Sequence, residues 1–427
     1  MEIIGKGAYG PIWKVQLKRK IPKSNLPINS IFAMKEMSKV KIYHKKAVDS
    51  VLNERLFLEK LHFPFLINMN YAFQTTDHLY VIMDLYRGGT LGYHTEIDSK
   101  YTERQIKFIV TNIILSLQYI HSHHIVHRDV TPSNLVFDLD GFLHLTDFGY
   151  AQECKPGEEI VDSNGTIEYM APEVLFEKPH THVVDYYSLG VVTYELLTGF
   201  LPYSGRTRKA IKEEMASRPI TLNKNDLPNG WKDYSVIEFT LGLLKHKQQE
   251  RLGYKSIKEI MNHQWLEKID WNSIRNMGCV TPITYSQFEK YYIVDDLYKK
   301  EEEKNQFDEE YVKKCLDSIT EGRYFADYYF DVKNKATYDN QGKFFSKRTL
   351  ETTYNYKSMT NSERMLKGPK KIKYKVELGK NNYEFETSGK VLPHKNENKK
   401  DNEKVISTSA KDPNSIKLNE QIIYTLK

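Results

Sequence analysis

The chain has 427 residues, 40% of them hydrophobic and 12% aromatic, which is enough apolar material for more than one compact unit. Lysine and arginine total 62 against 56 aspartate and glutamate, and a formal charge of +6 spread this thinly does not indicate nucleic-acid binding. The three cysteines are widely spaced and form no CxxC pair, which argues against a disulfide framework or a structural zinc. Charged residues begin too early for a signal peptide, and no apolar run is long enough to span a membrane. We therefore expect a globular protein of the cytoplasm or nucleus.

The first part of the chain, to about Leu85, is predicted to form a small sheet with one helix. Short β-like runs cover residues 12–17, 31–35 and 79–85. Between the last two runs, four apolar residues recur at the spacing of one face of an amphipathic helix: Val48, Val51, Leu52 and Leu56.

At the start of this part, the segment GKGAYGPI, residues 5–12, fits the pattern G-x-G-x-x-G with a β-branched residue two positions later. Glycines at these positions let a backbone close over phosphate groups without obstruction by side chains. Alone, the pattern fits an ordinary glycine-rich turn or a dinucleotide loop equally well. The β-like run that follows disfavours the dinucleotide loop, because that loop leads into a helix.

The segment FAMK places Lys35 on a predicted strand, and Glu54 projects from the helix that follows. A fixed ammonium can hold two phosphates of a nucleotide, and a carboxylate can hold the lysine in turn. Taken alone, Glu54 would be interpreted as a solvated helix charge. The motifs further along the chain favour the paired role.

After the glycine pair Gly88-Gly89 the sequence becomes helical, which predicts a larger helical lobe. Its first long helix carries an apolar stripe made of Ile106, Ile109, Val110, Ile113, Ile114 and Leu117. Thr102 and Gln105 form a capping box at its start. Further on, an Asp-Gly turn predicts a hairpin between residues 135 and 145.

Three residues around this hairpin complete a set for phosphoryl transfer. The HRD segment supplies Asp129, whose carboxylate can orient an acceptor hydroxyl or accept its proton. Asn134 and Asp147, the latter in a DFG segment, offer hard oxygen ligands for Mg²⁺. Three residues downstream are assigned structural roles only: Glu173 of an APE segment, its partner Arg251, and Asp185, which braces the catalytic loop.

These motifs occur in order and at the expected intervals, so residues 2 to about 270 resemble a eukaryotic protein kinase. The segments HFPFLINMNYAFQ and LYVIMDLYRGGTLGYH resemble the AGC group. The segments IDWNSI, residues 269–274, and YIVDDL, residues 292–297, are similar to those that follow the kinase domain in YANK-type Ser/Thr kinases. The resemblance implies a two-lobed α+β fold, ATP and Mg²⁺ as cofactors, and transfer of phosphate to Ser or Thr of protein substrates in signal transduction.

The resemblance also implies a division of the chain. A kinase domain would occupy residues 1–270, with a small lobe at 1–85 and a large lobe at 86–270, followed by an extension at 271–332. Residues 333–427, rich in Lys, Asn, Glu and Ser, are predicted to be disordered. The Lys-rich residues 367–375 leave membrane or RNA contact open, although such runs are more often solvated and flexible. We expect a monomer that does not bind DNA.

Carried over position by position, the resemblance implies a nucleotide site. Met83 would be the gatekeeper behind the adenine, and residues 84–86 the hinge whose backbone binds it. The adenine ring would lie between Ile12, Ala33, Leu91 and Val136. The implied nucleotide-binding residues are Ile4, Gly5, Lys6, Gly7, Ala8, Tyr9, Gly10, Ile12, Ala33, Lys35, Met83, Asp84, Leu85, Tyr86, Leu91 and Val136. An apolar spine between the lobes would consist of Leu58, Met69, His127 and Phe148.

Thr131 is the one departure from this set, because Ser/Thr kinases usually carry a lysine two residues after the catalytic aspartate. A hydroxyl donates one hydrogen bond but brings no charge, and losing one preorganised donor typically costs ~10²–10³ in rate. Lys35, Asp129 and the metal ligands are all present, which favours a working kinase. Thr166 is expected to bond the catalytic aspartate through its hydroxyl, which favours Ser/Thr acceptors. The alternative is a pseudokinase that binds nucleotide and partners without transferring phosphate.

Three residues are predicted to regulate the site. Arg128 precedes the catalytic aspartate, and in kinases with this arginine a phosphate on the activation segment usually pairs with it. The register of GTIEYMAPE puts Asp162 at the position of the phosphorylated residue, so a permanent carboxylate is expected to give basal activity. A solvated loop charge is the alternative for Asp162. Ser163 is a phosphorylation candidate.

Substrate choice is predicted to differ from that of arginine-directed relatives. The positions at which they carry acidic residues are Thr90 and Ser133 here, and Glu195 remains as one acidic contact. We expect only a weak preference for basic residues. The segment FADYY, residues 325–329, resembles only distantly the F-x-x-aromatic motif with which AGC kinases bind their own small lobe. The fit is poor, and the segment is assigned no role.

Overall fold

The computed structural model describes residues 2–18, 27–97, 101–205, 207–283, 307–326 and 328–331, and three strands between residues 373 and 393. The chain divides into two compact units. The first consists of Met1–Leu17 with Asn29–Asp331, and the second of Lys18–Ile28 with Val332–Lys427. All residues with a predicted chemical or regulatory role lie in the first unit. No helix in the described ranges is both long and apolar enough to cross a membrane.

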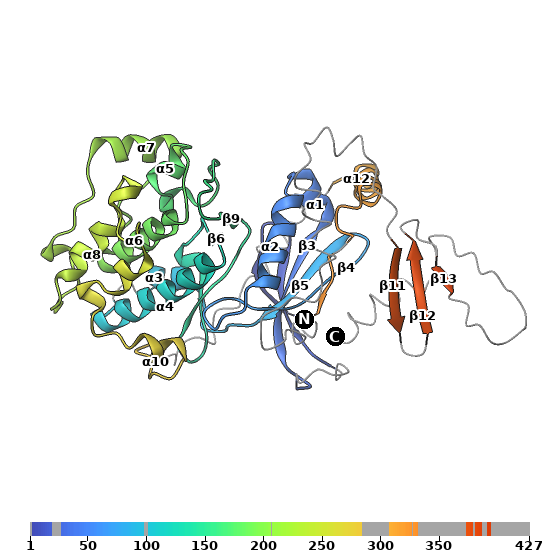
Figure 1. Cartoon of the computed structure of the whole chain (residues 1–427), viewed down its shortest axis with the longest axis horizontal. Helices are drawn as coiled ribbons and strands as arrows, with labels where there is room; N and C mark the ends of the chain where they lie inside the picture. The colour runs from blue at the N-terminus through green and yellow to red at the C-terminus, as the bar shows by residue number, and fades with distance from the viewer. Residues whose placement is uncertain are drawn as a thin grey trace, which may run out of the picture. The chain divides into compact units, whose positions relative to one another are not determined.

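The small lobe of the first unit contains a six-stranded antiparallel sheet (Figure 1). Its strands are β1 (Glu2–Lys6), β2 (Pro11–Gln16), β3 (Ile31–Ser38), β4 (Met69–Gln74), β5 (His78–Asp84) and β10 (Phe330–Asp331). Their spatial order is β1-β2-β3-β5-β4-β10. The predicted β-like runs correspond to β2, β3 and β5. The sheet is wider than predicted, because β10 reaches its edge from a remote part of the chain.

Two helices, α1 (Lys39–His44) and α2 (Val48–Lys60), follow β3. Of the predicted apolar face of α2 only Val51 is buried. Val51, Glu54, Arg55 and Leu58 are buried at helical spacing, whereas Leu52 and Leu56 are only half-buried. The buried face includes the charged residues Glu54 and Arg55, so the spacing of apolar residues alone does not identify it.

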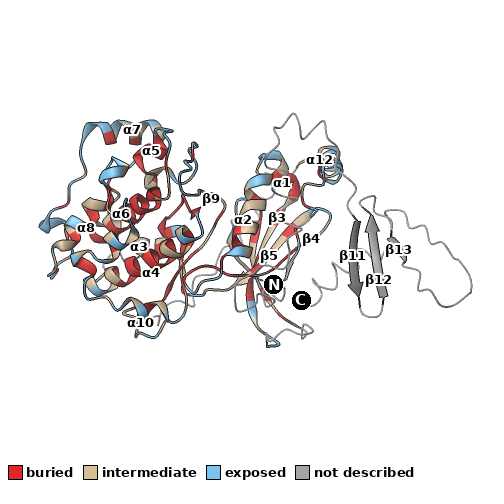
Figure 2. Ribbon diagram, viewed as in Figure 1, coloured by how far each residue is buried: buried red, intermediate tan, exposed pale blue. Residues whose placement is uncertain are grey.

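The large lobe is mainly helical, as predicted, and its central helices are the most deeply buried (Figure 2). Its helices are α3 (Leu91–Ile97), α4 (Glu103–Ser122), α5 (Pro172–Leu175), α6 (Val183–Thr198), α7 (Arg208–Ser217), α8 (Ser235–Leu243), α9 (Ile257–Met261) and α10 (Trp271–Arg275). The capping box at the start of α4 is confirmed, with both hydrogen bonds between Thr102 and Gln105 present.

Two short antiparallel strand pairs hold the catalytic loop. The predicted hairpin is confirmed as β7 (Leu135–Phe137) and β8 (Leu143–Leu145), in which Leu135 pairs with Leu145. The second pair consists of β6 (Ile125–Val126) and β9 (Gln152–Glu153). The loop from Val126 to Leu135 therefore begins and ends in a sheet, which restricts its conformations.

The C-terminal extension folds back onto the small lobe, and the FADYY segment is part of this contact. Helix α12 (Glu309–Gly322) packs against α1 (Figure 1). Phe325 and Tyr328 are 3% and 1% exposed, and Gln74 of β4 donates to the carbonyl oxygen of Phe325 over 2.6 Å. The expectation that FADYY has no role was wrong, because two of its three aromatic side chains, Phe325 and Tyr328, are buried, and the segment bonds to β4.

The second unit contains a three-stranded antiparallel sheet of β11 (Lys373–Leu378), β12 (Asn381–Glu386) and β13 (Val391–Pro393). It lies within the stretch predicted to be disordered. Apolar and polar residues alternate in KYKVEL and NNYEFE, a strand pattern that the composition of the stretch concealed. The rest of residues 333–427 and the YIVDDL segment lie outside the described residues, so the predictions made for them remain predictions.

Candidate active site

Strand β3 and helix α2 bring Lys35 and Glu54 together. Nζ of Lys35 donates to Oε1 of Glu54 over 2.6 Å, and the two side chains are 13% and 9% exposed. Burial alone would lower the pKa of Lys35, but the carboxylates of Glu54 and Asp147 outweigh burial and raise it. Lys35 therefore remains charged at neutral pH, as a residue that holds phosphate groups must.

The glycine segment forms a turn between β1 and β2. The N–H of Gly7 donates to the carbonyl oxygen of Gly10 over 2.8 Å. A Cβ on Gly10 would lie 2.3 Å from the carbonyl oxygen of Glu36, so the close approach of this turn to β3 requires glycine. Among the other predicted residues here, Ile4, Gly5 and Lys6 lie in β1, and Ala8 and Tyr9 lie in the turn.

Three of the four predicted walls of the adenine site lie on strands, namely Ile12 on β2, Ala33 on β3 and Val136 on β7. The fourth, Leu91, requires a correction. Ala33 pairs with Met83 of β5, and Ile12 lies on β2 opposite Lys35. Val136 on β7 is half-buried. Leu91 is fully buried at the start of α3, so it has no accessible surface for a ring. Leu91 is therefore part of the buried core.

In the predicted hinge, the side chains of Asp84, the last residue of β5, and of Tyr86 form hydrogen bonds within the protein. Oδ1 of Asp84 accepts a hydrogen bond from Asn70 over 2.9 Å. The hydroxyl of Tyr86 donates to the carbonyl oxygen of Leu66 over 3.2 Å, and its ring stacks on His144 with centroids 3.7 Å apart. The N–H of Asp84 also donates to the carbonyl oxygen of Asn68 over 3.1 Å, so adenine binding by the backbone of residues 84–86 stays a prediction.

Both carboxylate oxygens of Asp129 are fixed by hydrogen bonds. Nδ2 of Asn134 donates to Oδ2 of Asp129 over 2.7 Å, and the N–H of Thr166 donates to Oδ1 over 2.8 Å. The prediction assigned the second contact to the Thr166 hydroxyl, whereas the backbone makes it. The backbone approaches this closely because Gly165, with φ 119°, packs where a Cβ would lie 2.4 Å from the carbonyl oxygen of Arg128.

Thr131 is buried in the loop between Asp129 and Asn134, at 4% exposure. It precedes the short helix η1 (Pro132–Asn134), and its carbonyl oxygen accepts the N–H of Asn134 over 3.0 Å. Its hydroxyl does not cap that helix. Thr131 therefore shapes the loop through its backbone and contributes no charge to it.

Asp147 and Asn134 have the free oxygens that Mg²⁺ prefers. Oδ1 of Asp147 accepts the N–H of Gly149 over 3.1 Å. Burial of the carboxylate would raise the pKa of Asp147, but the ammonium of Lys35 and the bond from Gly149 lower it. Because Nδ2 of Asn134 is bound to Asp129, its Oδ1 is left as a ligand. The residue types fit the metal that the resemblance implies.

Asp185 on α6 braces the catalytic loop, as predicted. Its buried carboxylate accepts the backbone N–H groups of His127 and Arg128 over 2.9 Å and 2.7 Å, and Nε2 of His121 lies 2.7 Å away. Arg128 has φ 68°, a left-handed conformation that is costly for a side chain of this size. The bonds to Asp185 hold that conformation.

Two further structural predictions are confirmed. The four residues of the predicted spine are all buried: Leu58, Met69, His127 and Phe148. Within it, the rings of His127 and Phe148 meet edge to face at 5.1 Å. The guanidinium of Arg251 makes two hydrogen bonds, of 2.6 Å and 2.9 Å, to the carboxylate of Glu173. This buried pair ties α5 to the segment that follows α8.

The predicted pairing of Arg128 with Asp162 is present. A guanidinium N–H of Arg128 donates to Oδ1 of Asp162, and Nε donates to the carbonyl oxygen of Tyr150 over 2.7 Å. The neighbouring Ser163 has a different partner, Arg208 on α7. Asp162 is therefore part of an ion pair beside the catalytic loop rather than a solvated loop charge.

Two contacts that hold α2 were not predicted from the sequence. The hydroxyl of Ser50 donates to the carbonyl oxygen of Gly149, which links α2 to the DFG segment. The guanidinium of Arg55 donates to the carbonyl oxygen of Tyr329 over 2.6 Å, which links α2 to the C-terminal extension. The F-x-x-Y spacing of the extension was the signal that could have indicated the second contact. Both contacts flank Glu54.

The positions predicted to govern substrate choice carry little accessible negative charge. Thr90 and Ser133 are neutral, as the sequence states. Glu195 on α6 accepts a hydrogen bond from the hydroxyl of Tyr169 over 2.7 Å, and burial raises its pKa. The remaining acidic contact is thus bound within the protein.

Comparisons with known proteins agree with this geometry. The protein kinase domain family matches residues 1–266. The chain is 35% identical over 285 residues to the serine/threonine-protein kinase Sgk1 of Danio rerio, covering 66% of this chain and 62% of that protein. It is 36% identical over 279 residues to a putative ribosomal protein S6 kinase alpha-2 of Caenorhabditis elegans, covering 64% of this chain and 35% of that protein. With Protein kinase 2 of Dictyostelium discoideum, it shares 32% identity over 274 residues, covering 64% of this chain and 54% of that protein.

The chain therefore spans about a third to three fifths of the length of these three relatives. The YANK-type subdivision remains a prediction, since these comparisons do not address it. The matched region contains every catalytic and nucleotide-binding residue described above. The chain belongs to the protein kinase family, as a member of AGC type.

Proposed function

We propose that the protein is an ATP- and Mg²⁺-dependent serine/threonine kinase that phosphorylates proteins. The observation that carries the proposal is the Lys35–Glu54 ion pair of 2.6 Å. In protein kinases this pair must be in place for phosphoryl transfer. Its presence next to a fixed Asp129 and an ionised Asp147 supports a chain arranged for catalysis.

Four residues of the site have separate roles in the proposed reaction. Asp129 would orient the acceptor hydroxyl, because Asn134 and the N–H of Thr166 fix its carboxylate in place. Lys35 would hold phosphate oxygens of ATP, since its ammonium keeps its charge. Asn134 and Asp147 would hold Mg²⁺, which neutralises charge on the phosphates when it is bound.

A pseudokinase is the second candidate, and Thr131 is the observation that favours it. Losing the usual lysine removes one cation from the place where charge develops, at a typical cost of ~10²–10³ in rate. We still favour the enzyme, because the lysine–glutamate pair, the aspartate network and the spine are assembled together.

The further expectations about partners belong to this proposal. Protein Ser/Thr side chains are the proposed acceptors, and the Sgk and S6 kinase names of the relatives support this class. The proposed location is the cytoplasm or nucleus, and the proposed state is a monomer. All three cysteines are free.

The test is a kinase assay of the full chain on a serine/threonine peptide array with radiolabelled ATP and Mg²⁺. We expect incorporation by the wild type and none by Asp147→Asn or Asp129→Asn. Nucleotide binding is measured in parallel by thermal shift with ATP and Mg²⁺. ATP binding without transfer on any peptide would support the pseudokinase, and equal activity of Asp129→Asn and wild type would refute the proposed mechanism.

A further inference from the structure

Three cations beside the activation segment, residues 147–173, make no ion pair with a carboxylate of the described residues. Arg208 and Lys212 lie one turn apart on α7, and Lys178 follows α5. The ammonium groups of Lys212 and Lys178 lie 5.3 Å and 5.9 Å from the ring centroid of Phe176. We call Arg208, Lys212 and Lys178 the basic cluster. By contrast, Lys209 on the same helix pairs with Glu213 at 3.8 Å.

Arg208 is held in place by the activation segment and still has donors to spare. Its guanidinium donates to the hydroxyl and the carbonyl oxygen of Ser163, whose hydroxyl donates to the carbonyl oxygen of Val174 over 2.9 Å. A guanidinium has five N–H donors. The others have no acceptor among the described residues, and no nitrogen of Arg208 is both buried and unsatisfied. Nε, the nitrogen without a bond to Ser163, is therefore not buried, and the side chain as a whole is half-buried.

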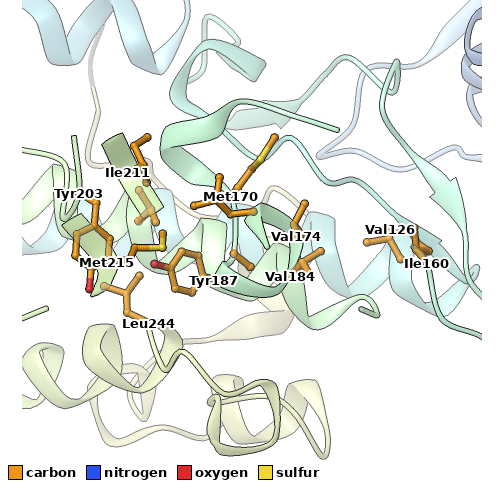
Figure 3. Packing of buried hydrophobic residues seen from close by; sticks show 13 residues of the cluster. Val126, Ile160, Met170, Val174, Val184, Tyr187, Tyr203, Ile211, Met215 and Leu244 are labelled. Atoms are coloured by element: carbon orange, nitrogen blue, oxygen red, sulfur yellow. The ribbon is translucent and has the colours of Figure 1, made fainter. Parts of the chain in front are cut away.

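The helix that carries the cluster is fixed by the core of the large lobe. Ile211 and Met215 of α7 pack with Val174 and Tyr187 in one buried cluster (Figure 3). Arg208 and Lys212 lie on the same helix as these anchors, so their positions relative to the activation segment are set by packing. The two positive charges of α7 are thus carried by a helix that is packed on the core and not by a free loop.

The basic cluster lies within reach of a peptide bound at the catalytic aspartate. Ser163, which contacts Arg208, is three residues before Thr166, whose N–H donates to Asp129. Three residues of chain span at most about 11 Å. A residue a few positions from an acceptor hydroxyl at Asp129 is therefore within reach of Arg208.

We propose that the basic cluster selects protein substrates that carry acidic side chains next to the phosphorylated residue. The inference rests on the proposed kinase function and names its substrate class. The complementary features point the same way, because Thr90 and Ser133 are neutral and Glu195 is bound by Tyr169. Arg208 is the main specificity residue, since a guanidinium binds a carboxylate with two parallel hydrogen bonds.

A phosphoryl group on Ser163 would be an alternative anionic partner for Arg208. The geometry disfavours it, because the hydroxyl of Ser163 donates to the carbonyl oxygen of Val174. A phosphate without a proton to donate would face that carbonyl oxygen and be repelled by it. Asp162 already supplies the carboxylate for Arg128. The acidic side chain of a substrate is therefore the occupant that fits.

The test is a peptide library with a fixed serine, in which each flanking position is varied among Glu, Gln and Lys. We expect the wild-type chain to prefer Glu over Gln at one or more positions, by roughly three- to tenfold in kcat/KM, as for a charge-assisted contact. Arg208→Gln keeps a donor for Ser163 and removes the charge, so it should abolish this preference while leaving the rate on the all-Gln peptide unchanged. Lys209→Gln is the matched control, and it should retain the preference.

Each outcome decides the inference separately from the proposed function. Phosphorylation of all-Gln peptides without preference for Glu at any position would refute the inference and leave the kinase standing. The same conclusion follows if Arg208→Gln retains the full preference. Activity on no peptide at all would refute the proposed function, and the inference with it. The library is repeated with phosphatase-treated enzyme and with Ser163→Ala. A preference for Glu that appears only after phosphorylation of Ser163 would assign Arg208 to that phosphate and overturn the inference.

Discussion

At the catalytic loop, Thr131 is the departure from the usual kinase residues that is expected to affect the rate of phosphoryl transfer. It is buried between Asp129 and Asn134 and brings no charge. Asp129 does not need it for orientation, since Asn134 and Thr166 already fix both carboxylate oxygens. The cost of the missing lysine therefore falls on stabilisation of the phosphoryl group and not on the position of the aspartate.

Thr131→Lys is expected to raise kcat on a serine peptide, by up to ~10²-fold, the typical effect of one preorganised donor. The added ammonium would face charge that develops on the phosphoryl group. The measurement is kcat at saturating ATP for Thr131→Lys and, as a control, Thr131→Ser. A lower kcat in Thr131→Lys with an unchanged melting temperature would show that the loop has adapted to the hydroxyl.

In phosphatase-treated enzyme, Asp162→Ala is expected to lower activity several-fold, because it removes the partner of Arg128. The loss of stability should be about 1 kcal/mol, since Asp162 is 33% exposed. Rates are measured for phosphatase-treated wild type, Asp162→Ala and Asp162→Asn. Full activity in Asp162→Ala would mean that the built-in carboxylate does not order the activation segment.

At the scale of elements, α2 is held from three sides. Glu54 binds Lys35 on β3, Ser50 binds the DFG segment, and Arg55 binds the C-terminal extension. These contacts lie within two turns of one helix, so we expect a change at the extension to affect the lysine–glutamate pair. The extension is therefore expected to act as a permanent support of the small lobe.

Tyr328→Ala tests this support. The residue is 1% exposed, and removing a buried aromatic side chain typically costs ~3–5 kcal/mol. We expect a lower melting temperature and a lower kcat, because α2 loses its support. Tyr328→Phe is the matched control, since the hydroxyl is buried with no hydrogen-bond partner among the described residues. It should be as stable as wild type or more so. Normal kcat in Tyr328→Ala would separate the extension from catalysis.

Lys39, the first residue of α1, makes stability depend on pH. Burial lowers its pKa from 10.5 to about 8, although Asp77 opposes the shift. Below pH 8 the folded protein bears the full cost of the buried charge. Between 8 and 10.5 the unfolded chain binds more protons than the folded one, so stability rises with pH.

The free energy of unfolding of wild type, relative to Lys39→Met, is therefore expected to increase as pH rises above 8. Below that value the difference should be constant. Urea unfolding across this range measures it, and Lys41→Met serves as a control on the same helix. A difference that does not change with pH would show that Lys39 is not the titrating group.

At the scale of the whole molecule, the site draws its residues from both lobes. Lys35 and Glu54 come from the small lobe, and Asp129 and Asp147 from the large lobe. Contacts such as that between Ser50 and Gly149 join them. The residues with proposed roles all lie in the first compact unit, which ends at Asp331.

A chain that ends after Asp331 is therefore expected to keep the melting temperature and kcat of the full chain. A chain that ends after Ile283 loses α12, Phe325 and Tyr328, and its melting temperature should fall by roughly 5 °C or more. Differential scanning calorimetry and the peptide assay compare the two with the full chain. Loss of activity in the longer of the two shortened chains would assign a catalytic role to the second unit.

The sequence alone determined the chemistry of the site and the order of its parts. Phosphoryl transfer requires an ammonium, a carboxylate base and hard metal ligands, and few residue types supply them, so Lys35, Asp129, Asn134 and Asp147 could be identified from their spacing. Local signals were equally readable. The capping box of α4 and the Asp-Gly hairpin involve neighbours in the chain, and both are confirmed.

Only the tertiary structure decided which distant residues meet. The buried face of α2, the use of the Thr166 backbone, the partner of Ser163 and the docking of Tyr328 all join segments that are far apart in the sequence. Leu91 was assigned to the adenine wall and is in the core, because the direction of a side chain at a helix start depends on how the helix packs. Such contacts depend on the shape of the packed lobes, which is a property of all the residues together and not of any local pattern.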